Sequence, residues 1–324
     1  MEYMPDFRLH RPTELAEAVK LRTQEGALYV AGGTDMIVNI RRGIERPKAL
    51  VDLSAIAALG EIADDADGLH IGSGVALERL SRDPSVRARY AAVADAASAV
   101  AGATHQRYGT LGGNLCLDTR CLFYNQSEWW RKSNDYCLKE RGSVCHVAPG
   151  GKRCFAAFSG DVAPAMLVHD AEVDLVGANG ARRIPLAELY RNDGMAHLAL
   201  EPGELLTTVH LPKAAEGAAS AYEKARIRSA IDFPLAGVAV WLKQSGGKVE
   251  ELRIALTAVN PYPHRVTRLD TYAGAALDDA ALDEIRETVR TQAKPMRTTT
   301  VKPYYRRRVV GALARRLVAR LAQG

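Results

Sequence analysis

Residues 27–43, ALYVAGGTDMIVNIRRG, decide the fold of this 324-residue chain. A short apolar run ends at Gly32-Gly33 and a second periodic run follows, which predicts a strand, a glycine turn and a helix. Glycine lets the backbone approach an anion closely, and the first N–H groups of a helix have no partner within it. We therefore interpret residues 30–35 as a candidate phosphate-binding loop.

A second glycine loop, TLGGN, occupies residues 110–114. Its glycines permit an anion-binding concave backbone, and the Thr110 and Asn114 side chains add hydrogen-bonding groups. Either loop alone is also compatible with a simple turn, because glycine is the usual turn residue. Neither loop matches GxGxxG or GxxxxGK[ST], which disfavours a nicotinamide Rossmann site and an ATPase.

The surrounding chain alternates between helical and strand patterns. Capping and periodicity predict a helix after Pro12, an alanine-rich helix over residues 85–103, and a helix and strand before a turn at Asn179-Gly180. From about residue 220 the pattern changes to strands followed by helices. We expect a domain boundary near residues 213–219, which divides the chain into residues 1–216 and 217–324.

Four of the five cysteines crowd into residues 121–154, CLFYNQSEWWRKSNDYCLKERGSVCHVAPGGKRC. Four thiolates are the ligand set of a tetrahedral zinc ion or an iron–sulfur cluster. The segment contains no CxxC pair, and its spacing does not decide between the two metals. Its aromatic residues favour a solvent-shielded redox centre or simply the core of a small loop-rich insert. The candidate ligands are Cys121, Cys137, Cys145 and Cys154, with Cys116 or His146 as substitutes.

The composition is that of an ordinary globular protein, with 47% hydrophobic residues and a formal charge of 43 − 38 = +5. This charge does not indicate a nucleic-acid partner, and no apolar run approaches the ~20 residues of a membrane span. The N-terminus lacks the apolar segment of a signal peptide. We therefore expect a cytoplasmic protein whose cysteines more often bind metal than form disulfides, two disulfides being the alternative.

Several motifs taken together resemble one known family. AGGTD, TLGGN, GDVAPAML, LLTTVHLP and AYEKARIRSAIDFP, in this order, resemble the FAD-binding medium subunits of the molybdenum hydroxylases, such as those of xanthine dehydrogenase and carbon monoxide dehydrogenase. The resemblance implies an α+β fold: a PCMH-type FAD-binding domain of two α/β lobes, followed by a C-terminal domain with a small antiparallel sheet and a helical bundle.

The resemblance also implies the FAD-binding residues. Asp161 would hydrogen-bond the adenosine or ribityl part of FAD, Leu206 would pack near the isoalloxazine, and Lys224 would lie close to that ring. Residues of the two glycine loops would surround the pyrophosphate: Tyr29, Val30, Ala31, Gly32, Gly33, Thr34, Asp35, Met36, Thr110, Gly113 and Asn114.

About forty residues, 117–157, interrupt the family pattern between TLGGN and GDVAPAML. A cysteine-bearing insertion at this place resembles the β subunit of 4-hydroxybenzoyl-CoA reductases. That resemblance implies a [4Fe–4S] cluster held by Cys121, Cys137, Cys145 and Cys154, and electron flow from reduced ferredoxin. The partners would be a small subunit with [2Fe–2S] clusters and a large subunit with the molybdenum cofactor, where 4-hydroxybenzoyl-CoA is reduced to benzoyl-CoA.

Two alternatives remain open at this point. The chain could be the flavin subunit of a dehydrogenase that runs in the oxidative direction, or a zinc-stabilised FAD-binding module with an assembly role. The insert carries seven basic residues against four acidic ones, and we expect this excess to attract an acidic ferredoxin. The basic residues are Arg120, Arg131, Lys132, Lys139, Arg141, Lys152 and Arg153.

Overall fold

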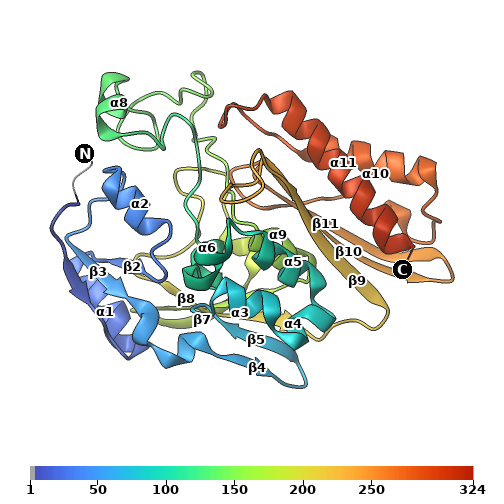
Figure 1. Ribbon diagram of the computed structural model, residues 1–324, viewed down its shortest axis with the longest axis horizontal. Coiled ribbons are helices and arrows are strands. Elements are labelled where there is room, and N and C mark those ends of the chain that lie inside the picture. Colours follow the sequence, from blue (N-terminus) through green and yellow to red (C-terminus); the bar gives the residue numbers. More distant parts are fainter. Residues whose placement is uncertain (1–3, 324) are drawn as a thin grey trace.

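The computed structural model describes residues 4–323, whose strands form three sheets. The first lobe is a three-stranded parallel sheet of order β1-β3-β2 with two helices (Figure 1). Gly26 ends the first helix in the left-handed conformation, with φ of 59°. The elements of this lobe are β1 (Arg8–His10), α1 (Leu15–Glu25), β2 (Leu28–Val30), α2 (Met36–Arg41) and β3 (Ala49–Asp52).

The second lobe is built on a five-stranded antiparallel sheet of order β4-β5-β8-β6-β7. Its apolar face packs with the central helices into the largest core of the described residues. The strands are β4 (Ile62–Asp64), β5 (Gly68–Gly72), β6 (Glu172–Gly177), β7 (Gly180–Pro185) and β8 (Leu205–Pro212). The helices are α3 (Leu77–Arg82), α4 (Pro84–Arg89), α5 (Ala91–Ala99), α6 (Ala103–Tyr108), α7 (Leu111–Leu115) and α9 (Val162–Val168).

The single alanine-rich helix expected over residues 85–103 is wrong, because this stretch belongs to three helices, α4, α5 and α6. Tyr90 interrupts the first two with a non-helical backbone, φ of −133° and ψ of 52°. Its side chain is fully buried, and its hydroxyl donates to the carbonyl of Pro212 over 2.8 Å. Tertiary packing of this one aromatic ring therefore overrides the local helix propensity of the alanines.

The C-terminal part is a four-stranded antiparallel sheet of order β12-β11-β10-β9, with helices against one face (Figure 1). Along β10, Val238, Val240 and Leu242 point toward α10 and α11, whereas Ala239 and Trp241 join the core around α5 and α9. Both faces of this sheet are thus covered by apolar residues. The elements are β9 (Ala218–Ala225), β10 (Ala236–Ser245), β11 (Lys248–Thr257), β12 (His264–Arg265), α10 (Asp279–Gln292) and α11 (Pro303–Ala322).

The cysteine-bearing insert lies above α2 in Figure 1 and consists of loops around one short helix, α8 (Glu128–Ser133). Ser127 caps α8 by accepting from the backbone N–H of Trp130. The insert is closed at its base by two backbone hydrogen bonds between Arg120 and Ala157, of 2.7 and 2.8 Å. Within residues 4–323 no helix combines the length and apolar character needed to cross a membrane.

Candidate functional site

The two glycine loops, far apart in sequence, meet in the structure. Gly33 adopts the left-handed conformation, with φ of +67°, between β2 and α2. A Cβ atom on Gly32 would overlap the carbonyl oxygen of Tyr108, two residues before the second loop. Only glycine therefore permits this contact, and the first loop lies directly against the start of the second.

Thr110 and Asn114 organise the second loop. The Thr110 hydroxyl accepts from the backbone N–H of Gly113 over 3.1 Å and caps α7. The Asn114 side-chain oxygen accepts from the N–H of Val162 over 2.9 Å, which joins this loop to the start of α9. The second loop is therefore locked to the segment that presents Asp161.

Asp161 and Lys224 form a buried pair, with side-chain exposures of 4% and 3%. The Asp161 carboxylate accepts from Lys224 Nζ over 3.1 Å and from the Tyr222 hydroxyl over 2.6 Å. Burial raises the pKa of Asp161 and lowers the pKa of Lys224, and each charged partner opposes the shift of the other. Tyr222 was missed by sequence reasoning, although it stands two residues before Lys224 on the same face of β9.

The remaining predicted FAD residues occupy packing positions. Leu206 is buried in β8 opposite Leu175 and belongs to the main core. Met36 packs with Val30 in a small cluster beneath α2. The Tyr29 hydroxyl donates to the carbonyl of Gly203 over 2.8 Å, and burial raises its pKa to about 12. Contact of these side chains with a flavin stays a prediction.

The four predicted cysteines line one cavity of the insert. All five cysteines of the chain are free, so the disulfide alternative is wrong. Cys116 packs against the main core and is not among the lining residues. Among residues 4–323, no three His, Cys, Asp or Glu side chains are placed to hold a single metal ion. The cavity is lined by Cys121, Phe123, Tyr124, Cys137, Leu138, Lys139, Cys145, His146, Val147, Cys154 and Ala156.

Backbone N–H groups point toward the sulfur atoms. Burial raises the pKa of the Cys121 thiol to about 11, and the N–H groups of Phe123 and Tyr124 act in the opposite direction. Burial raises the pKa of Cys154 to about 12, and the N–H of Ala156 lies 3.4 Å from its sulfur. The negative charge of a thiolate is therefore unfavourable in this cavity unless a bound cation compensates it. Soft donors, N–H···S contacts and an apolar surround match the requirements of an iron–sulfur cluster.

The insert keeps Lys132, Arg141 and Lys152 exposed, so attraction of an acidic ferredoxin stays a prediction, but other basic residues are not on the surface. The side chains of Arg131 and Lys139 are only 1% and 5% exposed, and both are paired with carboxylates. Arg120 is mostly buried and pairs with Asp35 of the first glycine loop, while its guanidinium lies 4.6 Å from the centre of the Phe233 ring. The pairs of Arg131 and Lys139 therefore connect parts of the insert to one another, and the pair of Arg120 attaches the insert to the first glycine loop.

The insert also contacts the C-terminal part. The N–H of Leu122 donates to the carbonyl of Thr298 over 2.9 Å. Thr298 in turn accepts, at its hydroxyl, from the fully buried guanidinium of Arg306 on α11 over 3.1 Å. These partners lie 176 and 184 residues after Leu122 and gave no local signal in the sequence.

Comparison with known proteins agrees with this geometry. Residues 5–214 match the family described as FAD binding domain in molybdopterin dehydrogenase, and residues 220–321 match the CO dehydrogenase flavoprotein C-terminal domain. The aldehyde oxidoreductase FAD-binding subunit PaoB of Escherichia coli (strain K12) is 30% identical, over 94% of this chain and 95% of that protein.

Two further similarities involve carbon monoxide dehydrogenases. The medium chain from Afipia carboxidovorans is 28% identical, over 97% of this chain and 96% of its own length. The crystal structure of Cu,Mo-CO dehydrogenase in a cyanide-inactivated form contains a chain of the same fold, with a TM-score of 0.81, 27% identity and 98% coverage of both chains.

Proposed function

The chain belongs to the family of FAD-binding flavoprotein subunits of molybdopterin dehydrogenases, and from this premise we propose that it is an electron-relay subunit carrying FAD and a [4Fe–4S] cluster. FAD exchanges one or two electrons and so can join one-electron iron–sulfur carriers to a two-electron reaction. The protein's own contribution is to hold both groups close together and away from water.

The proposed direction is reductive. Electrons come from reduced ferredoxin and go toward [2Fe–2S] clusters and a molybdenum cofactor on partner subunits. The reaction there is the dehydroxylation of 4-hydroxybenzoyl-CoA to benzoyl-CoA, in the cytoplasm. This part of the proposal rests on the resemblance of residues 117–157 to the insertion of that type of reductase.

The observation that carries the proposal is the cysteine cavity. Four thiols, from residues 121, 137, 145 and 154 of the insert, line one cavity. The insert is attached to the first glycine loop through the ion pair of Arg120 and Asp35. Residues 30–35 and 110–114 would hold the pyrophosphate, with Asp161 and Lys224 as a buried polar pair near them. A redox cluster beside a flavin loop has an evident use, because thiolate-bound iron carries electrons and zinc does not.

A second candidate is the same flavin subunit working in the oxidative direction. It is favoured by the names of the similar proteins, which are an aldehyde oxidoreductase and a carbon monoxide dehydrogenase. In that case the cluster would pass electrons outward to an acceptor. The two candidates share their cofactors and differ in the order of reduction potentials.

Anaerobic purification followed by iron, sulfide and flavin analysis tests the proposal. We expect one FAD with about four iron and four sulfide per chain, and a brown colour that bleaches on reduction. A cluster potential low enough to reduce the flavin, together with reduction by ferredoxin, would support the reductive direction. A yellow protein without iron would exclude the cluster, and a colourless protein that binds zinc would favour the assembly module.

A further inference from the structure

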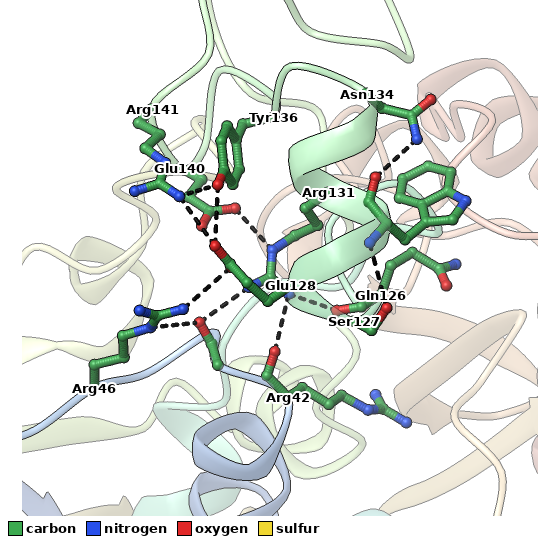
Figure 2. A network of polar contacts seen from close by, with 12 residues as sticks. Arg42, Arg46, Gln126, Ser127, Glu128, Arg131, Asn134, Tyr136, Glu140 and Arg141 are labelled. Carbon is green, nitrogen blue, oxygen red and sulfur yellow. Dashed lines mark hydrogen bonds and ion pairs between the residues drawn. The ribbon is translucent and has the colours of Figure 1, made fainter. Parts of the chain in front are cut away.

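Arg131 lies at the junction between the insert and the C-terminal end of α2 (Figure 2). Its guanidinium is buried, although it comes from α8, a helix on the outside of the molecule. Nη2 donates to the carbonyl of Gly43 over 2.9 Å, and Nη1 donates to the carbonyl of Arg42 over 3.3 Å. These two carbonyls stand at the C-terminal end of α2, which begins directly after residues 31–35.

The other side of the same guanidinium reaches the loop that presents Cys137. Arg131 Nε donates to the Glu140 carboxylate over 2.8 Å. The backbone N–H of Glu140 donates to the Cys137 carbonyl over 3.0 Å, and the N–H groups of Lys139 and Glu140 also face the Cys137 sulfur. Arg131 therefore touches, through hydrogen bonds, both the helix after the flavin loop and the loop of a cluster ligand.

Helix α2 is held by the insert at both ends. At its start Asp35 pairs with Arg120, which lies at the base of the insert. At its end the Arg42 and Gly43 carbonyls accept from Arg131. A six-residue helix fixed at both ends cannot shift without moving the insert, because its hydrogen-bonded turns are stiff.

We propose that Arg131 is a positioning residue that couples flavin binding to cluster binding, an inference that rests on the function proposed above. An ordered flavin loop fixes the position of α2, which follows it directly. The carbonyls at the end of α2 fix Arg131, and Arg131 in turn fixes Glu140 and the loop that presents Cys137. FAD thereby slows loss of the cluster. Because the coupling of two binding free energies is reciprocal, the cluster raises the affinity for FAD by the factor by which FAD raises the affinity for the cluster.

The test measures iron release to a chelator under anaerobic conditions from the full chain, with FAD bound and after its removal by high salt. We expect FAD to slow iron release about fivefold or more in the natural protein, within the usual range of coupling between sites. R131M should bring this ratio close to one, and R131K should restore it only in part because lysine lacks the planar fork. Equal release with and without FAD in the natural protein would overturn the proposal.

Arg141→Met is the matched control. Arg141 also bonds to Glu128, but it is exposed and makes no bond to α2. R141M should therefore keep the FAD effect, and loss of the effect in R141M would contradict the assignment to Arg131. If R131M does not fold, E140Q tests the proposal instead, because it weakens only the bond from Arg131 toward the Cys137 loop. An unchanged ratio of iron-release rates in E140Q overturns the proposal. Natural protein lacking iron or flavin would instead refute the proposed function itself.

Discussion

The C-terminal sheet and the cysteine insert are stabilised in opposite ways. In β10 successive side chains enter two different apolar cores, so burial of hydrocarbon holds the sheet on both faces. The insert buries thiols and the charged groups of Arg131 and Lys139, with few aliphatic residues. Buried charges are costly unless every partner is in place, so the insert depends on its attachments and its ligand far more than the sheet does.

Loss of one proposed cluster ligand should have the largest effect and should fall on the insert alone. We expect C137S to lose nearly all iron and the visible absorption of the cluster, because a hydroxyl is a poor ligand for iron–sulfur centres. Limited proteolysis should then cut within residues 117–157. Cys116→Ser is the control, since Cys116 lies outside the cavity, and it should keep its iron. Equal iron content in the two variants would contradict the ligand assignment.

A cavity in the C-terminal core should have the next largest effect and should leave the insert intact. Leu317 is fully buried on α11. Its replacement by alanine should lower the free energy of unfolding by about 2–5 kcal/mol, measured by urea denaturation. The neighbouring Arg316 makes an exposed ion pair with Glu223, and R316A should cost less than about 1 kcal/mol. Loss of iron from folded L317A would show that the two regions are not independent.

Mild acid should have a smaller effect and should lower the free energy of unfolding by about 2 kcal/mol at pH 5. His169, at the end of α9, faces the Ser220 hydroxyl of β9 over 3.1 Å, and burial lowers its pKa to about 3, with Arg253 acting in the same direction. Below about pH 6.5 the imidazole of His169 binds a proton in the unfolded chain but stays neutral in the folded protein. Stability is therefore complete above pH 6.5 and falls by about 1.4 kcal/mol per pH unit between pH 6.5 and about 3.

The variant H169Q checks this titration. Denaturation midpoints at pH 7.5, 6 and 5 should change less in H169Q than in the natural protein, by the effect of one proton. His197, whose pKa burial lowers to about 4, should account for part of the slope that remains. An identical pH dependence in both proteins would mean that His169 is not the group that titrates.

The same contrast explains how much could be predicted from the sequence. Local signals located β2, the glycine turn and α2, and the strands expected after about residue 220 are confirmed by β9, β10 and β11. The clustering of cysteines predicted that they converge, and they do line one cavity. The break at Tyr90 and the burial of Arg131 were not predictable. Both depend on carbonyls far away in the sequence, Pro212 for Tyr90 and Gly43 for Arg131, which no local pattern reports.

The hydrogen bond from Leu122 to Thr298 has a consequence for biosynthesis. After Leu122 the ribosome must add 176 more residues before Thr298, the partner of Leu122, is part of the chain. At about 5–20 residues per second this takes roughly 10–35 s, during which the nascent insert exposes free thiols without its last backbone contact. On the function proposed above, delivery of iron and sulfide therefore belongs after chain completion, and the free thiols are open to oxidation during that interval.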